Sequence, residues 1–346
     1  MAHTFLDPAP ITRHLRAKAG SWLLVAAVHH FDLFELLDNG QMSPEQLQKS
    51  LQIAPRPAKV LFPALCAMEL MRYNRLGNYE LTDLGRLLVK SNPNHLTGYT
   101  GLERDEPGVL KMVEWLQHDG PKSGVQGFAY VKDERTESPM DDPEAATFFT
   151  MALAGRAKYL SPIVADKMSR RNGHLLDVAG GTGYYSYEWL LFNPSSTATI
   201  IDTPEVLKVA KGILDNFKRR DEIMSRVNFV SGDMLKDDLP KADIILAASL
   251  FHDWPEETCL HLANRFAKAL HTGGEIWMHD AFLHDSLDGP LPVTDYSAML
   301  FLGTKGRCYS RQEYYSWLVS AGLKPTDKNI PTLMDYSLIS AVKPLK

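Results

Sequence analysis

The chain has 346 residues, of which 45% are hydrophobic and 23% charged, a composition typical of a globular protein with room for two domains. The net charge of −5 gives no electrostatic basis for binding nucleic acid or an anionic membrane, and the longest apolar runs are too short to span a bilayer. Three dispersed cysteines and an N-terminus without a secretory pattern predict a cytoplasmic protein that lacks a disulfide framework and a zinc knuckle.

Residues 10 to 165 are predicted to be mostly helical. The segment from Ser21 to Leu37 is apolar nearly all round, which indicates burial on several sides or in a subunit interface. Ser43 followed by Pro44 has the pattern of a helix start. Residues 72–85 then predict a β-wing, two short strands around Gly77.

Helix, turn, helix and wing in succession would suit a DNA-binding protein. The second helix, Arg56 to Leu70, is however apolar, and its only basic residues are Arg56 and Lys59. A recognition helix needs donors for phosphates and base edges. We therefore interpret this region as a scaffold or dimerisation element.

From about His174 the pattern changes to short apolar strands that alternate with helices, which predicts a parallel sheet with helical crossovers. The predicted strands are residues 174–179, 197–202, 227–233, 242–250 and 274–280, with a final strand at 337–342. The predicted helices are residues 204–220, 256–270 and 310–322.

A glycine-rich turn, Asp177 to Gly183, follows the first of these strands. Its spacing lacks the G-x-G-x-x-G fingerprint of nicotinamide dinucleotides. An acid just before the glycines suits a cofactor with a cationic amino-acid end. Asp202, after the second strand, can accept ribose hydroxyls, and Asp233 with Met234, after the third, can flank an adenine. These positions share the carboxyl edge of the sheet, where ligands bind in such folds.

The fourth strand runs into Phe251, His252, Asp253 and Trp254. His252 could be a catalytic base, a metal ligand or a turn residue that only packs. The His-Asp pair recurs at 279–280 and 284–285, which brings a metal site into consideration. Adjacent residues on a strand point to opposite faces, so most of these side chains are not expected to converge, and no metal is predicted.

The motifs DVAGGTG, IID, SGDML, LFHDWPEE and LHTGGEIWMHD occur in this order. Together they resemble the S-adenosylmethionine-dependent O-methyltransferases of the caffeic-acid and hydroxyindole type and their bacterial natural-product counterparts. The resemblance implies an α/β fold with a doubly wound, mostly parallel seven-stranded sheet whose last strand is antiparallel. It also implies a winged-helix dimerisation domain at 1–100, a helical linker to the substrate pocket at 101–165, a catalytic domain at 166–346, and a homodimer.

The resemblance also assigns roles in the site. It makes His252 the general base and Asp280 the acid that orients it, and it places Asp253 and Trp254 on the cofactor side. The residues expected to bind S-adenosylmethionine are Asp177, Gly180, Gly181, Gly183, Asp202, Asp233, Met234 and Trp254.

One position departs from the family pattern, because Cys308 stands where the plant enzymes have a second glutamate. Either Asp280 alone orients His252, or the chemistry differs from that of the plant enzymes. Cys308 itself is a candidate acceptor-site residue or a buried small residue. Phe148, Met151, Met299 and Phe301 are candidate walls for a flat acceptor, although Phe148 and Met151 at helical spacing suit a core equally well. Whether Tyr184, Tyr185 and Tyr187 line the cofactor or cover the sheet is left open.

The predicted activity is methylation of a hydroxyl on a small aromatic molecule. The alternatives are C- or N-methylation, for example of an α-keto acid or a heteroaromatic, and, from another class, an NAD-dependent oxidoreductase.

Overall fold

The computed structural model describes residues 6–121, 139–168 and 172–345. The chain forms two compact units. Of the described residues, 6–121 and 282–310 belong to the first unit, and 139–168, 172–281 and 311–345 belong to the second. No helix in the described ranges is long and apolar enough to cross a membrane.

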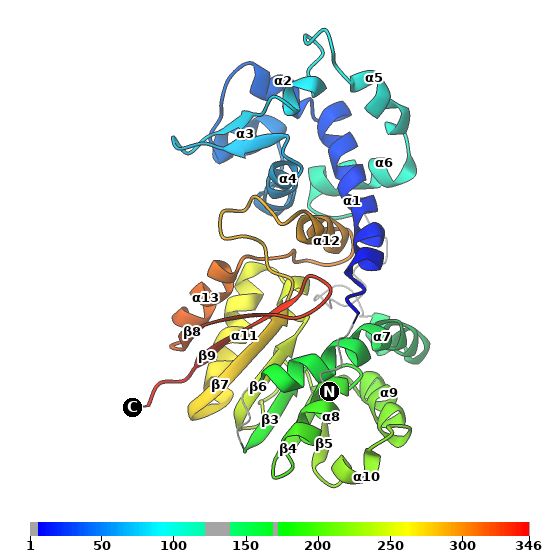
Figure 1. Ribbon diagram of the computed structural model, residues 1–346, viewed down its shortest axis with the longest axis vertical. Coiled ribbons are helices and arrows are strands. Elements are labelled where there is room, and N and C mark those ends of the chain that lie inside the picture. The colour runs from blue at the N-terminus through cyan, green and yellow to red at the C-terminus, as the bar shows by residue number, and fades with distance from the viewer. Residues whose placement is uncertain (1–5, 122–138, 169–171, 346) are drawn as a thin grey trace. The chain divides into compact units, whose positions relative to one another are not determined.

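The first unit is helical and contains one small hairpin (Figure 1). Its helix α12 comes from far along the chain and packs against α1 and α4. The elements are α1 (Ala9–His29), α2 (Leu33–Asp38), α3 (Pro44–Leu51), α4 (Pro55–Ala67), β1 (Met71–Tyr73), β2 (Tyr79–Leu81), α5 (Thr97–Thr100), α6 (Pro107–His118) and α12 (Leu291–Phe301).

The local signals in this unit behave as predicted. Ser43 Oγ accepts the backbone N–H of Gln46, and the Gln46 side chain accepts the backbone N–H of Ser43, a capping box at the start of α3. β1 and β2 form an antiparallel hairpin whose turn contains Gly77 at a φ of +82°. The apolar segment 21–37 is buried on several sides, but it is divided between α1 and α2 because Asp32 adopts a left-handed φ of +46°.

Arg56, one of the two basic residues of the second predicted helix, makes its contacts inside this unit. Its Nε donates to Asp119 Oδ1 at 2.7 Å, and its Nη1 donates to the carbonyl oxygens of Thr304 and Gly306. Its guanidinium also lies over the Phe301 ring, 4.6 Å from the centroid. These contacts argue against α4 as a base-reading helix.

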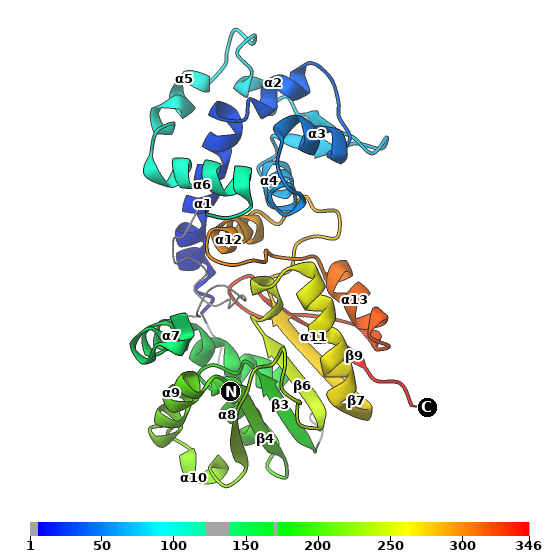
Figure 2. The same cartoon turned by 180° about the vertical axis from the view of Figure 1, so that it is seen from behind.

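The second unit is an α/β sandwich (Figures 1 and 2). Helix α8 covers one face of the sheet and α11 the opposite face. The elements are α7 (Pro143–Lys167), β3 (His174–Val178), α8 (Tyr184–Phe192), β4 (Thr197–Asp202), α9 (Pro204–Asp215), α10 (Arg220–Ile223), β5 (Val227–Ser231), β6 (Ala242–Ala248), α11 (Glu256–Ala269), β7 (Leu270–Asp280), α13 (Arg311–Ser320), β8 (Lys324–Pro331) and β9 (Ser337–Val342).

The seven strands have the order β5-β4-β3-β6-β7-β9-β8. β3 to β7 pair in parallel, and β9 is antiparallel to β7 and to β8. The predicted doubly wound, mostly parallel sheet is therefore confirmed. β8 was not predicted from the residues, because it contains Pro325 and Pro331. The two prolines are compatible with a strand here because β8 is an edge strand that pairs only with β9.

The division into units differs from the three predicted segments. Residues 282–310 belong to the first unit, because α12 packs on α1 and α4. Helix α7 belongs to the second unit, where it packs against α8 and α9. The predicted linker at 101–165 is thus split between the two units.

Candidate active site

The strand order brings four predicted motifs to one edge of the sheet. β5, β4, β3 and β6 are parallel neighbours, so the residues that follow them share the carboxyl edge. Asp202 is the last residue of β4, and the glycines, Asp233 with Met234, and the 3-10 turn Phe251–Asp253 follow β3, β5 and β6. An open parallel sheet binds its ligands at this edge, beside the point where strand order reverses.

The glycines of the turn have separate structural reasons. A Cβ on Gly180 would lie 2.8 Å from Ile200 Cγ2, and one on Gly183, at a φ of +77°, would overlap the Tyr187 ring. Gly181 also has positive φ, +55°, but a Cβ there would meet nothing nearer than a carbonyl oxygen at 4.0 Å. The turn therefore packs tightly on the protein side and is open at Gly181, where a ligand can approach the backbone.

Two acids flank this turn, the buried Asp177 and the half-buried Asp202. Asp177 Oδ2 accepts a hydrogen bond from Ser186 Oγ at 2.8 Å, and Asp202 Oδ2 accepts the Gly181 N–H at 2.9 Å. Burial raises the pKa of Asp177 to about 7 and that of Asp202 to about 6. A cation bound beside them would favour their charged forms and reverse that shift.

The adenine end of the predicted crevice is more open. Asp233 Oδ1 accepts the Leu235 N–H at 2.8 Å, and the Met234 carbonyl oxygen accepts from Arg265 Nε at 2.7 Å. Thr203, directly after Asp202, has a buried hydroxyl oxygen with no hydrogen-bond partner among the described residues. Such an oxygen normally pairs with a group from a ligand or a water.

His252 and Asp280 come together although 28 residues separate them in sequence. His252 Nδ1 lies 2.6 Å from Asp280 Oδ1, and only 3% and 2% of the two residues are exposed. A carboxylate only accepts, so the proton of the neutral imidazole is assigned to Nδ1. The lone pair is then on Nε2, which is the atom able to take up a proton.

The charges that act on His252 come from three elements, β7 (Asp280), the turn after β6 (Asp253) and α7 (Arg156). Burial opposes its protonation, but Asp280 and Asp253 outweigh burial and raise the pKa of His252. Asp253 Oδ1 is 3.7 Å from His252 Nε2, and burial raises the pKa of Asp253 to about 6. The positive charge of Arg156, on α7, opposes protonation of both.

Two residues near this dyad were not found by sequence reasoning. Tyr314, on α13, donates from its hydroxyl to Asp280 Oδ2 at 2.6 Å. Arg156 Nη1 donates to the Tyr336 hydroxyl at 2.8 Å, and its guanidinium lies over that ring. Neither residue belongs to a recognisable motif, and each comes from a helix far from the dyad in sequence.

The histidines of the other His-Asp pairs do not join His252. The ring nitrogens of His279 lie 3.3 Å from the Tyr185 hydroxyl and 2.9 Å from Thr332 Oγ1. Tyr187 donates to the Ala210 carbonyl oxygen, so Tyr185 and Tyr187 both have buried structural hydrogen bonds. His284, in the first unit, pairs with Asp288 at 2.9 Å.

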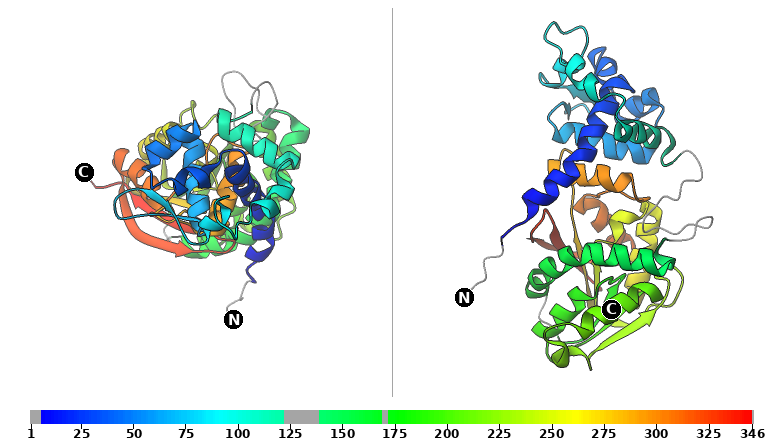
Figure 3. Two further views of the ribbon diagram at one scale, coloured as in Figure 1. Left: turned by 90° about the horizontal axis from the view of Figure 1, so that it is seen from above. Right: turned by 90° about the vertical axis from the view of Figure 1, so that its right-hand side faces the viewer.

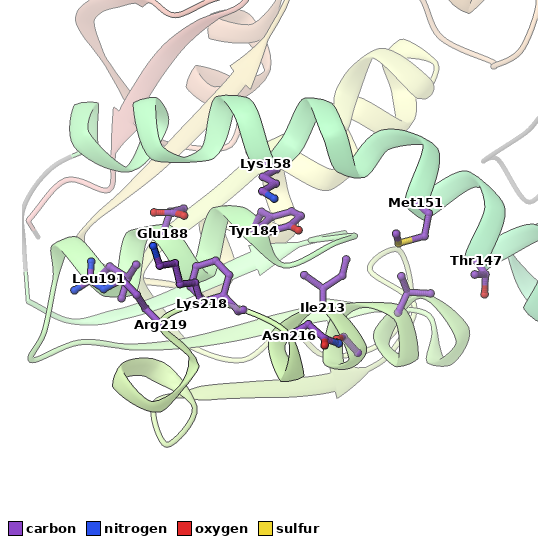
Figure 4. Close-up of a pocket in the computed structure, with 13 residues that line it drawn as sticks. Thr147, Met151, Lys158, Tyr184, Glu188, Leu191, Ile213, Asn216, Lys218 and Arg219 are labelled. Carbon is purple, nitrogen blue, oxygen red and sulfur yellow. The ribbon is translucent and has the colours of Figure 1, made fainter. Parts of the chain in front are cut away.

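The candidate acceptor walls are distributed over both units. In the second unit, Phe148 is 68% exposed on α7, and Met151 lines a groove of about 840 Å³ with Tyr184 and Ile213 (Figure 4). The residues that line the groove come from α7, α8, α9 and the segment that follows α9, and they include neither His252 nor Asp280.

In the first unit, Met299 is 41% exposed and Cys308 is fully buried, its backbone N–H donating to Ser297 Oγ at 3.1 Å. Phe301 is not a wall: it is fully buried and packs edge-on against Trp115. Its apolar character reflects its place in the core of the first unit.

A doubly wound sheet with a glycine turn and strand-end acids is the architecture of the class I methyltransferases. A family model of the O-methyltransferase domain matches residues 139–324, more than half of the chain. The chain therefore belongs to the O-methyltransferase family and is a methyltransferase dependent on S-adenosylmethionine.

Three relatives illustrate the range of the similarity. An O-methyltransferase family 2 protein from Planctomyces limnophilus, solved in complex with apigenin, is 34% identical with a TM-score of 0.86, over 98% of this chain and 96% of that chain. The 3-hydroxy-5-methyl-1-naphthoate 3-O-methyltransferase of Streptomyces sahachiroi is 28% identical over 84% of this chain and 82% of its own length. The N,N-dimethyltransferase OxyT of Streptomyces rimosus is 25% identical over 99% of this chain and its full length.

Proposed function

We propose that this enzyme methylates a hydroxyl group on a small aromatic acceptor and that His252 is the general base. The observation that carries the proposal is the buried His252–Asp280 pair, 2.6 Å apart at the edge of the sheet that also carries the glycine turn. The relatives named for a hydroxynaphthoate and solved with apigenin support an aromatic hydroxyl as the acceptor.

The residues at this edge fit S-adenosylmethionine by their chemistry. Asp177 suits the ammonium group, and Asp202 suits the ribose hydroxyls, with the orphaned Thr203 hydroxyl beside it. The open side of Gly181 lets the backbone approach the cofactor. The positive charge of Arg156 suits the carboxylate of S-adenosylmethionine.

Asp233, Met234 and Trp254 are proposed to flank the adenine.

The chain's own residues supply the proton transfer. S-adenosylmethionine, when bound, supplies a methyl group on a sulfonium that is already activated for transfer. A phenol has a pKa near 10, so only about one molecule in a thousand is ionised at neutral pH. His252 Nε2 would accept the hydroxyl proton as the methyl group passes from the sulfonium to the acceptor oxygen and the sulfur is left as a neutral thioether. This proton transfer would contribute roughly 10² to 10⁴ in rate. Asp280 holds the ring and stabilises the imidazolium that forms.

The direct test is the identity of the product. The purified protein is incubated with S-adenosylmethionine and a panel containing apigenin, 3-hydroxy-2-naphthoate and its 3-amino analogue. We expect a mass gain of one methyl group, located on oxygen by NMR, for at least one hydroxyl compound. Methylation of the amine alone would transfer the assignment to nitrogen, which the similarity to an N,N-dimethyltransferase makes the second candidate.

The pH dependence of cofactor binding tests the role of Asp177. Because the pKa of Asp177 is about 7, its carboxyl is partly protonated at neutral pH before the cationic ligand binds. We expect S-adenosylmethionine to bind more weakly as the pH falls below about 7, and binding at pH 7 to release protons, as measured by calorimetry in buffers of different ionisation enthalpy. Asp177→Asn should remove the pH dependence of binding that Asp177 causes. Only the dependence that arises from Asp202 should then remain. A dissociation constant that stays flat between pH 6 and 8 argues against the assignment.

A homodimer formed through the first unit is proposed on the apolar surface of α1. Its N-terminal turns extend beyond the neighbouring helices of that unit (Figure 3), and they expose Ile11 at 68% and Leu15 at 70%, one turn apart. Packing of Ile11 and Leu15 against a second copy of the chain would remove these two side chains from water and favour the dimer.

Light scattering is expected to give the mass of a dimer for the wild type and of a monomer for Leu15→Glu. Leu76→Glu is the matched control, because Leu76 is 76% exposed in the β1–β2 turn, away from α1. A monomeric wild type, or a dimer that only the control breaks, contradicts the proposal.

A further inference from the structure

The carboxylate of Asp280 is held at both of its oxygens. Oδ1 accepts from His252 Nδ1 at 2.6 Å and from the Ala281 N–H at 2.8 Å, and Oδ2 accepts from the Tyr314 hydroxyl at 2.6 Å. Three donors from β7, the turn after β6 and α13 therefore converge on one side chain. Of these donors, only the hydroxyl of Tyr314 reaches Oδ2.

The Tyr314 ring has little freedom. It is 1% exposed and lies 5.4 Å, between ring centroids, from both Phe251 and Trp317. Phe251 precedes His252 directly, so the same packing fixes the hydroxyl and the turn that carries the imidazole. With the ring locked, the hydroxyl meets Asp280 Oδ2 at a set position, which fixes the plane of the carboxylate.

We propose that Tyr314 is a positioning residue that acts on His252 through Asp280. The proposal rests on the proposed function, in which His252 is the base. The charged Asp280 is buried, and the donor at Oδ2 keeps its carboxylate correctly oriented beside Nδ1, while the two donors at Oδ1 still favour its charged form. The resemblance places Cys308 where related enzymes have a second glutamate, and in this chain a neutral tyrosine is the second side chain bonded to the dyad acid.

Tyr314 also limits how strongly Asp280 acts on the imidazole. A carboxylate that shares its charge with a hydroxyl donor is a weaker acceptor for His252 than one that does not. Removal of the hydroxyl should therefore favour the imidazolium. The other charged groups that act on His252 are Asp253 and Arg156, and Asp280 also interacts electrostatically with His279 and Tyr185. All of these stay in place in a variant that lacks only the hydroxyl.

The test compares Tyr314→Phe with Tyr315→Phe. Tyr315 is the next residue on α13, but its hydroxyl donates to the carbonyl oxygens of Thr326 and Lys328 on β8, so the control removes a hydroxyl from the same helix. The pKa of His252 is measured by NMR on histidine-labelled protein bound to S-adenosylhomocysteine, and its signal is identified by its loss in His252→Asn. This measurement needs no acceptor.

For Tyr314→Phe we expect the pKa of His252 to rise by about half a pH unit or more, with no change in Tyr315→Phe. With an acceptor from the panel, kcat should fall about 10- to 100-fold, the range known for metal ligands that lose an outer hydrogen-bond partner, and the KM for S-adenosylmethionine should stay constant. A His252 pKa that is unchanged or lower in Tyr314→Phe overturns the proposal. Turnover retained by His252→Asn would instead contradict the role of His252 as the base. The effect of Tyr314 on the pKa of His252 would still be decided by the NMR measurement.

Discussion

Replacement of His252 by alanine is expected to lower kcat by about 10²- to 10⁴-fold and to leave the dissociation constant for S-adenosylmethionine unchanged. The reason is that the imidazole follows β6 and is held by Asp280, whereas the proposed contacts to the ammonium group and the ribose come from acids at the ends of β3 and β4. Without Nε2, a hydroxyl acceptor must be ionised before it attacks. Single-turnover rates on enzyme saturated with the methyl donor measure the effect directly.

The matched control for this variant is His284→Ala. His284 also pairs with an aspartate, Asp288, but both side chains are 55% exposed and belong to the first unit. We expect turnover close to that of the wild type. The acidic limb of the pH profile is a second measurement: the base works in its neutral form, and its pKa is raised above 6.5, so activity should rise with pH through a value above 6.5. A His252→Ala enzyme with normal single-turnover rates would remove the general base from the mechanism.

The parallel part of the sheet was predictable because its strands are nearly continuous apolar segments. Ile244, Ile245 and Leu246 of β6 are fully buried, as expected for a strand covered on both faces. β8 was not predictable in this way, because Lys324–Pro331 is polar, contains two prolines and has strand partners on one side only. Its strand geometry comes from pairing with β9, a contact between chain segments and not a local preference.

The motifs could be predicted to share one edge of the sheet because each one lies at the end of a strand, and parallel neighbours place such residues together. The sequence does not reveal what surrounds them. Tyr314 and Arg156 reach the dyad from α13 and α7, and their contacts depend on the packing of those helices. The same limit explains the wrong assignment of Phe301: an apolar residue on a helix suits a ligand wall and a core equally, and only tertiary contacts distinguish the two.

Replacement of Asp280 by asparagine is the second substitution with a large expected effect. Asparagine has nearly the same shape, and its oxygen can still accept from His252 Nδ1 and the Ala281 N–H, while its amide faces the Tyr314 hydroxyl, which can turn to accept. The histidine tautomer is then retained, and what disappears is the negative charge. We expect kcat to fall by about 10²- to 10⁴-fold, because the buried imidazolium loses its principal counter-charge as it forms.

The direction of the pH effect makes this variant diagnostic. With Asp280 neutral, burial and Arg156 both oppose protonation of His252, and Asp253 alone favours it, so the pKa of His252 should fall and the acidic limb should move to lower pH. Tyr314→Phe should move the acidic limb to higher pH. Asp288→Asn, in the exposed pair with His284, should change neither kcat nor the limb. Opposite displacements by the two variants can arise only if the charge of Asp280 sets the basicity of His252; displacement in the same direction would mean that both substitutions merely disturb the packing around the ring.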